Sequence, residues 1–230
     1  MGGSQSTVIK PAFSFRVATK ADLDELARVH IEGFTEEPQV HYCYPLRHEY
    51  PEDHWKWTRR EYEDFLAQPQ KYLVHVLEAT AAANGRRSTT RTIAGHAVWN
   101  LEPLTAAIDP DPQEKERKDA NKKHCDAFKA ASGKRFHTYF AEWAEKQVNL
   151  SSLVVHPDFR RGGGGTMLVN WGIETAREKL WPVTLCASPM GRLLYTHLNF
   201  EEIASEIVQV EGEEETLVST VMIYPAKKHS

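Results

Sequence analysis

The sequence contains few cysteines. Only three occur in 230 residues, and Cys43, Cys125 and Cys186 lie far apart. An odd number of cysteines without C-x-x-C spacing excludes a disulfide framework and a cysteine-based zinc cluster. We therefore expect a fold held by apolar packing in a reducing compartment, and we predict no metal site.

Positive charge and long apolar runs are also scarce. Lys and Arg number 28 against 32 Asp and Glu, which gives a net charge of -4. This balance argues against a nucleic-acid partner, because such proteins carry a basic face. No run approaches the roughly 20 apolar residues that span a bilayer, and the N-terminus lacks an apolar signal segment. We expect a cytoplasmic protein without stable membrane insertion.

The first residues carry one targeting pattern. Residues 1–6 fit the M-G-x-x-x-S acceptor sequence for N-myristoylation at Gly2. A single acyl chain without a polybasic patch anchors a protein only marginally. The alternative that we favour is a small, polar, disordered leader over residues 1–12.

The remaining chain has the length and composition of one globular domain. Hydrophobic residues make up 41% and charged residues 26%, both ordinary values. We find no internal repeat and no composition shift that marks a boundary. We therefore predict a single domain over residues 13–225 and a tail over residues 226–230. The sequence leaves the oligomeric state open, a homodimer included.

The first half of the chain alternates between strand and helix patterns. An alternating strand pattern over 13–17 is followed by Thr19, a helix N-cap residue, and by helical spacing up to Gly33. A second helix is expected from Pro51 to Gln68. The strand patterns that follow, over 72–79 and 93–101, predict an antiparallel pair, with a hairpin signal at Asn84-Gly85.

A helical insertion is expected over about residues 104–148. Residues 113–131 read as a charged helix with few apolar positions. Four aromatic residues then follow at helical spacing and predict a narrow stripe, either packed in the core or bordering an acceptor pocket. These four residues are Phe136, Tyr139, Phe140 and Trp143.

The last third completes a mixed sheet. We expect strands over 150–155, 183–187, 204–210 and 216–224, and helices over 166–179 and 191–198, the latter closing at a left-handed Asn199. The buried side of the longer helix is marked by apolar residues. They are Met167, Leu168, Trp171, Ile173 and Leu180. The fold class is therefore α/β, an α+β mixed and largely antiparallel sheet with helices on both faces.

A glycine-rich turn between strand 150–155 and helix 166–179 indicates a phosphate site. Two arginines and four glycines occupy residues 160–165, directly before Thr166. Glycine lets the backbone approach a ligand closely, and a helix N-terminus offers unpaired N–H groups. A Walker loop is excluded because no lysine precedes Thr166, and a dinucleotide loop is excluded because Met167 and Leu168 stand where its last glycine belongs.

What remains is the pattern R-x-x-G-x-G, formed by Arg160, Gly163 and Gly165. It resembles the pyrophosphate loop of the GCN5-related N-acetyltransferase (GNAT) superfamily. Residues 188–200 resemble a second motif of that superfamily, N-x-x-A-x-x-L-Y-x-x-x-G-F. The chain matches its leucine, tyrosine and phenylalanine. It departs from the motif at three positions, namely Ser188 for Asn, Gly191 for Ala and Asn199 for Gly.

The resemblance implies a GNAT-like fold, a bound acetyl-CoA cosubstrate and a set of cofactor-binding residues. Acetyl-CoA would lie in a splay between the strands 150–155 and 183–187, with its pantetheine arm against the first of them. Its pyrophosphate would be held by the loop and by the start of the helix. The residues that this assigns to the cofactor are Leu153, Val154, Val155, Arg160, Arg161, Gly162, Gly163, Gly164, Gly165, Thr166 and Ser188.

Tyr195 is the catalytic candidate. Acetyl transfer from a thioester to an amine needs a neutral amine and a proton for the departing thiolate. By the resemblance, Tyr195 stands where the family places its general acid; the alternative is a packing aromatic or a residue that only holds the cofactor sulfur. The base stays open among several side chains. These are Glu102, Glu145, His41, His48, His54, His96 and His156.

The acceptor is expected beside the first two helices. Residues 36–57 are rich in Tyr, His, Trp, Glu and Asp, a composition that suits a cationic amine but also a packed lid. The leading hypothesis is transfer of an acetyl group from acetyl-CoA to a small-molecule primary amine by direct attack in a ternary complex. The alternatives are a protein or peptide N-acetyltransferase and a catalytically silent acyl-CoA-binding module.

Overall fold

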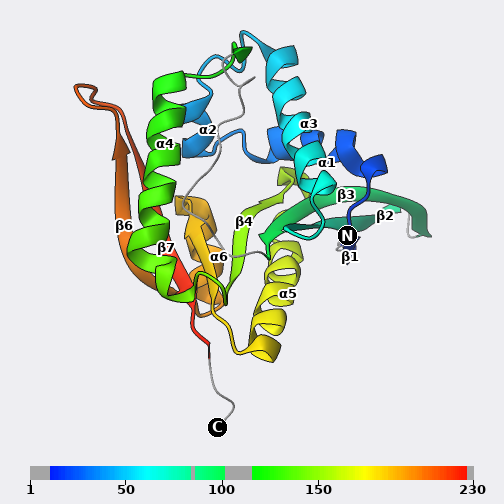
Figure 1. Cartoon of the computed structure of the whole chain (residues 1–230). Helices are drawn as coiled ribbons and strands as arrows, with labels where there is room; N and C mark the ends of the chain where they lie inside the picture. The colour runs from blue at the N-terminus through cyan, green and yellow to red at the C-terminus, as the bar shows by residue number, and fades with distance from the viewer. Residues whose placement is uncertain (1–10, 84–85, 102–115, 227–230) are drawn as a thin grey trace, which may run out of the picture.

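The structure, a computed structural model, describes residues 11–83, 86–101 and 116–226 (Figure 1). Seven strands form one sheet in the order β1-β2-β3-β4-β5-β7-β6, and every neighbouring pair is antiparallel except β4 and β5. This confirms the mixed, largely antiparallel sheet. The strands are β1 (Ala12–Val17), β2 (Tyr72–Ala83), β3 (Arg86–Asn100), β4 (Val148–Val155), β5 (Val183–Ala187), β6 (Glu201–Gln209) and β7 (Thr216–Tyr224).

Helices cover both faces of this sheet. Helices α1 and α3 pack together on one face of β2 to β4, and α5 packs on the opposite face (Figure 1). Helices α2 and α4 lie against the hairpin of β6 and β7. The helices are α1 (Leu23–Gly33), α2 (Pro38–Cys43), α3 (Pro51–Ala67), α4 (Lys122–Arg135), α5 (Gly164–Lys179) and α6 (Pro189–His197).

Strand alternation sends neighbouring residues to separate apolar clusters. On β3, Val98 packs in the cluster under α1 and α3, whereas Trp99 packs in the cluster under α5. The same alternation places Val76 of β2 with Val98 and Leu77 with Trp99. Because side chains of successive strand residues point to opposite faces, the sheet has a core on each side.

A bulge in β4 separates this strand from β5. In the β3–β4 ladder, Val98 pairs with Ser152 and Trp99 pairs with Leu150, so that Ser151 is the extra residue. The parallel ladder with β5 includes Leu150 and ends there. A bulge bends its strand and increases its twist. Beyond Leu150, the edge of β4 that faces β5 is therefore left without a strand partner among the described residues.

Local sequence signals account for several element ends. The Asp22 carboxylate accepts hydrogen bonds from the backbone N–H of Thr19 at 2.7 Å and from its hydroxyl at 3.0 Å, at the start of a 3₁₀ turn that leads into α1. Asn199 follows α6 with a φ of 64°, as expected of a residue that tolerates the left-handed conformation. Gly163 takes a φ of 90° directly before α5.

Some expected boundaries are wrong. Residues 117–121 are not helical, and α4 starts after Asn121, whose side chain accepts a hydrogen bond from the N–H of His124. Leu180 is 54% exposed rather than buried, because it ends α5 in the left-handed conformation with a φ of 56°. The short helix α2 was not expected. The expected leader ends one residue too late, because β1 already begins at Ala12. Residues 1–10 with Gly2, the Asn84-Gly85 turn, residues 104–115 of the insertion and the last four residues of the tail lie outside the described residues.

No helix in the described ranges is long and apolar enough to cross a membrane.

Gly172 permits close packing of α5 on the sheet. A Cβ atom at this position would overlap the indole ring of Trp99, which is fully buried. We expect Gly172→Ala to lower the free energy of unfolding by about 1–2 kcal/mol, because overpacking outweighs the helix propensity of alanine. Urea unfolding checks this, with Glu174→Ala on the exposed side of α5 as the control. Equal or greater stability of Gly172→Ala would contradict the packing argument.

The ion pair of Arg16 and Asp22 predicts a pH-dependent stability. Two guanidinium nitrogens lie 2.8 Å from the Asp22 oxygens, and this contact lowers the pKa of Asp22 from 3.8 to about 2. Asp22 therefore stabilises the fold above pH 4, and this stabilisation is lost as the pH falls towards 2. Because Arg16 is partly exposed, we expect Asp22→Asn to cost about 1–2 kcal/mol at pH 7.

Urea unfolding of the parent and of Asp22→Asn between pH 7 and pH 3 measures the contribution of the Asp22 carboxylate to the free energy of unfolding. The difference in unfolding free energy should shrink below pH 4. The exposed Asp24, which pairs with Arg59, supplies the control Asp24→Asn, for which we expect less than about 0.5 kcal/mol. A difference for Asp22→Asn that is constant with pH would exclude the ionised carboxylate as its source.

Candidate functional site

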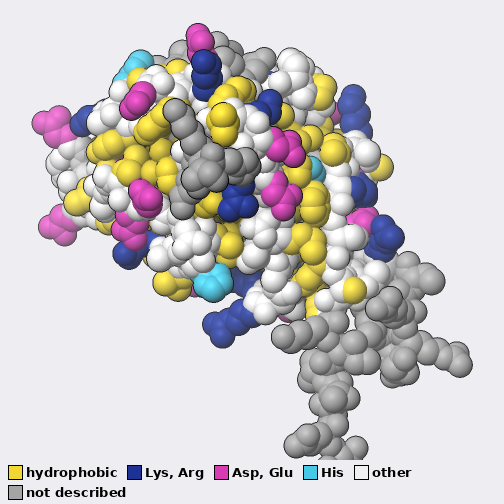
Figure 2. Space-filling view, turned by 90° about the horizontal axis from the view of Figure 1, so that it is seen from below, with side chains coloured by type: hydrophobic (Ala, Val, Ile, Leu, Met, Phe, Trp, Pro, Cys, Tyr) yellow, Lys and Arg dark blue, Asp and Glu magenta, His cyan; other side chains and the backbone are white. Residues whose placement is uncertain are grey.

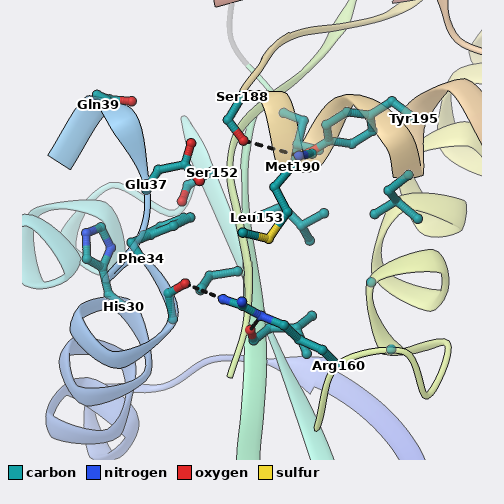
Figure 3. A pocket seen from close by; sticks show the side chains of 18 of the residues that line it. His30, Phe34, Glu37, Gln39, Ser152, Leu153, Arg160, Ser188, Met190 and Tyr195 are labelled. Carbon is teal, nitrogen blue, oxygen red and sulfur yellow. Dashed lines mark hydrogen bonds between the residues drawn. The ribbon is translucent and has the colours of Figure 1, made fainter. Parts of the chain in front are cut away.

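A large cavity occupies the gap that opens between β4 and β5. Its volume is about 750 Å³, and its wall runs from the glycine loop along β4 to α6 and to the end of α1 (Figure 3). The segment from Leu150 to Val155 forms one side, and Cys186, Ser188 and Tyr195 lie on the other. The divergence of the two strands therefore creates the site.

The glycine loop forms one end of this cavity. After β4 the chain makes a short turn, Pro157–Phe159, and Arg161 and Gly163 then take φ values of 60° and 90°. Helix α5 begins at Gly164, so that its first N–H groups have no intrahelical partner. Arg161 and the residues from Gly163 to Thr166 line the cavity. The arrangement offers backbone donors and positive charge to an anion.

Arg160 lines the cavity, and its side chain connects two elements of the fold by hydrogen bonds. Its guanidinium donates to the carbonyl of Val155 at 3.0 Å and to the carbonyl of Gly33 at 2.5 Å (Figure 3). This joins the end of α1 to the end of β4. Gly162 does not line the cavity; a Cβ atom there would meet the ring of Phe13, 2.7 Å away. Of the residues that the sequence assigned to the cofactor, all except Gly162 line the cavity.

The edge of β4 is the middle of the cavity. Leu153, Val154 and Val155 lie here, and Ser152 faces the cavity beside them (Figure 3). The carbonyl of Val155 already accepts from Arg160. Because this edge has no strand partner among the described residues, its other backbone groups are available to an extended ligand.

Tyr195 lies on α6 and is 6% exposed. Its ring packs against Phe200, with centroids 5.5 Å apart, and it lies over Gly191, where a Cβ atom would be 3.1 Å from the ring. Burial, followed by the nearby Glu37 and Cys186, raises the pKa of the Tyr195 phenol above its usual 10. The phenol is therefore protonated at neutral pH and can donate a proton.

Ser188 stands where the second motif usually has asparagine, and it caps α6. Its hydroxyl oxygen accepts a hydrogen bond from the N–H of Gly191 at 3.2 Å. Serine is an effective N-cap, so the substitution keeps the start of this helix. The hydroxyl proton is then free to bond to an acceptor on the opposite wall.

Glu37 is the acceptor that faces Ser188 across the cavity (Figure 3). Burial raises the pKa of Glu37 above 4.5, and the hydrogen bond with Ser188 and the charge of Arg160 oppose this rise. The sequence placed Glu37 only within an acidic and aromatic segment. Its position at the N-cap of α2, before Pro38, was the signal that could have distinguished it.

The base candidates from the sequence do not meet at the large cavity. His156 hydrogen-bonds Glu32, His54 bonds Asp119, and His41 bonds Arg47. None of them lines this cavity, nor do His96 and the exposed Glu145. Glu102 lies outside the described residues, and His48 lines a second, smaller cavity.

His30, which the sequence did not indicate as a base, lines the large cavity. Its Nδ1 lies 2.8 Å from the hydroxyl of Tyr62, and that hydroxyl lies 2.5 Å from Nε2 of His96. Burial, with the nearby charges of His54 and Arg117, lowers the pKa of His30 to about 3. His30 is therefore neutral at pH 7, and its low pKa makes it a weak proton acceptor.

The four aromatic residues of the expected stripe do not border the large cavity. Phe140 is buried and the other three are partly buried, in a π turn followed by a 3₁₀ turn.

Within the described ranges, no group of three or more His, Cys, Asp or Glu side chains is arranged to hold a metal ion.

Sequence comparison matches the chain to known acetyltransferases. Residues 40–200, more than half of the chain, match the acetyltransferase (GNAT) family. A curated acetyltransferase from Stachybotrys chartarum is 24% identical over 225 residues, covering 95% of this chain and 93% of the relative.

Solved structures show the same fold. A Corynebacterium glutamicum protein described as histone acetyltransferase HPA2 and related acetyltransferase superposes with a TM-score of 0.62 at 20% identity, over 96% of this chain and 99% of the other. The acetyltransferase yncA from Salmonella typhimurium, described as putative and solved with acetyl-CoA, gives a TM-score of 0.53 at 16% identity, over 95% and 96%. The chain belongs to the GNAT family and is an acetyl-CoA-dependent N-acetyltransferase.

Proposed function

We propose that the protein transfers the acetyl group of acetyl-CoA to a primary amine of a small molecule, by direct attack within a ternary complex. The observation that carries this proposal is the continuity of the large cavity. One space of about 750 Å³ passes from the glycine loop along β4 to Tyr195 and Glu37. Hydrogen-bond donors for an anion, a free strand edge, a proton donor and a carboxylate therefore line one cavity. Their order matches the pyrophosphate, the pantetheine arm, the thioester and the amine.

The donor half of the cavity supplies binding and orientation. In the proposal the N–H groups from Gly163 to Thr166 hold the pyrophosphate, and Arg161 adds charge at the loop. The backbone of Leu153 and Val154 pairs with the pantetheine arm as a further strand would. Because a thioester is already reactive, positioning supplies much of the rate enhancement.

Tyr195 is proposed as the proton donor to the departing thiolate. The amine nitrogen attacks the thioester carbonyl, the C–S bond breaks, and the sulfur takes the phenolic proton. The positively charged nitrogen then gives its remaining extra proton to the tyrosinate, which restores the phenol. The phenol carries its proton at pH 7, because burial keeps its pKa above 10. The burial of the ring, with Phe200 behind it, fixes the direction of the hydroxyl.

Glu37 is proposed to bind the ammonium group of the acceptor and to take its proton. A carboxylate with a raised pKa is a better proton acceptor than an exposed one, and His30 with a pKa of about 3 is a poorer one. The aromatic ring of Phe34 lies beside Glu37 and offers a face to a cation (Figure 3).

The direct test of the function is thiol release from acetyl-CoA in the presence of small amines and of peptides with free N-terminal or lysine amines. We expect small amines to stimulate release with the higher kcat/KM. A higher kcat/KM for peptides would favour the protein or peptide acetyltransferase alternative. Failure of every amine to stimulate release would refute the proposal.

Replacement of Tyr195 tests the proton donor. We expect Tyr195→Phe to lower kcat about 100-fold, because loss of a general acid typically removes a factor of this size. Affinity for CoA, measured by calorimetry, should change little. The control is Tyr139→Phe, which removes a hydroxyl outside the cavity. Full activity of Tyr195→Phe across the pH range would exclude the acid role.

Replacement of Glu37 tests the proton acceptor. The parent should lose activity as the pH falls through the raised pKa of Glu37, because the protonated carboxyl cannot accept a proton. We expect Glu37→Gln to lower kcat/KM about 100-fold and to abolish this acidic limb. Glu36→Gln, on the exposed neighbour, is the matched control. An unchanged pH profile in Glu37→Gln would rule out Glu37 as the base.

A further inference from the structure

A second cavity of about 280 Å³ adjoins the large one. The two share three wall residues, His30, Phe34 and Val40, so they lie side by side. The remaining wall of the second cavity comes from the end of α1, the segment after α2 and the first turn of α3. This cavity is thus next to the proposed amine site.

Arg47 in this wall is a buried cation that contacts no carboxylate of the described residues. It is 8% exposed, and its guanidinium donates to the carbonyl of Tyr44 at 3.1 Å and to Nδ1 of His41 at 3.0 Å. Arg135 is the comparable buried arginine, and it lies 2.7 Å from the carboxylate of Glu206. A buried charge normally has an opposite charge beside it. Arg47 has none among the described residues.

The surroundings of Arg47 do not compensate its charge. The described lining of the second cavity contains Arg47, three histidines and no Asp or Glu. The buried carboxylate of Asp119 contacts this lining and lies 2.6 Å from Nδ1 of His54. Arg117 also contacts Asp119, at 2.7 Å, so that the charge of Asp119 is already balanced. The second cavity therefore favours an anion.

We infer that the second cavity binds a carboxylate of the acceptor, with Arg47 as its partner. This inference rests on the proposed function and narrows its substrate to amines that also carry a carboxylate. The ammonium end lies at Glu37 in the large cavity, and the carboxylate end lies at Arg47. Trp55, 36% exposed, lines the second cavity and offers an apolar surface to the carbon chain between them.

Matched acceptors test the inference. Glycine, 4-aminobutyrate and 6-aminohexanoate place the carboxylate at increasing distance from the amine, and ethylamine, butylamine and hexylamine lack it. We expect kcat/KM of the parent to be at least about 30-fold higher for one amino carboxylate than for its amine counterpart, as for a buried charge pair. Arg47→Gln should remove this preference, so that the amino carboxylate and its amine counterpart give similar kcat/KM. The control Arg59→Gln, on the exposed side of α3, should keep it.

A second pair of variants tests the cavity without removing Arg47, in case Arg47→Gln does not fold. Thr35 is exposed and lines the second cavity. Thr35→Glu supplies a carboxylate to Arg47 and should reduce the preference for the amino carboxylate at least about 10-fold. Thr35→Gln introduces an uncharged side chain of the same shape as glutamate and should keep the preference. Calorimetry with the N-acetyl derivatives of all three amino carboxylates should show the same difference in binding for at least one of them, without any turnover.

The outcomes separate this inference from the proposed function. Thiol release with amines of both kinds at equal kcat/KM would overturn the carboxylate site and leave acetyl transfer to small amines standing. If no amine stimulates release, the proposed function fails. In that case the calorimetry still tests the carboxylate site. Binding of an N-acetyl amino carboxylate that is weakened by Thr35→Glu but not by Thr35→Gln would support the site. Absence of such binding in the parent would overturn the site.

Discussion

The bulge at Ser151 is the constraint on which the rest of the site depends. It coincides with the last parallel pair, between Leu150 and Leu185, so β4 bends away from β5 where the pairing ends. The exposed strand edge, the cavity and the approach of α6 all follow from this divergence. A regular ladder would satisfy these backbone groups within the sheet and leave no room for a ligand.

The polar groups along the two cavities differ in whether other side chains or backbone groups already bind them. Arg160 is engaged by the carbonyls of Val155 and Gly33, and it fixes the end of α1 against β4. Tyr195 is buried, Glu37 is partly buried on the facing wall, and burial raises the pKa of both groups. In the second cavity the Arg47 guanidinium donates to a backbone carbonyl and to an imidazole nitrogen. The two cavities share His30, Phe34 and Val40 in their walls and therefore lie next to each other.

Local patterns predicted much of the fold. The proline at position 51, the N-cap at Thr19 and the left-handed Asn199 located element ends because each acts through its own backbone geometry. Leu180 was predicted to be buried because it is apolar, yet the helix ends there and the side chain points outward. Helix α2 has only six residues, too few for a periodic pattern to be recognised.

The sequence by itself determined the glycine loop, the order of most elements and the family, because glycine, proline and capping residues fix their conformation over a few neighbours. Only the tertiary structure decided which side chains share the site. Glu37, Arg160 and Tyr195 come from segments far apart in the chain, and their meeting depends on how α1 and α6 pack beside the diverging strands (Figures 1 and 3). On the face of the molecule shown in Figure 2, apolar side chains are interspersed with side chains of both charges. The distribution of side-chain types on this face does not reveal where the cavity lies. Side-chain convergence is set by packing, which no local sequence pattern encodes.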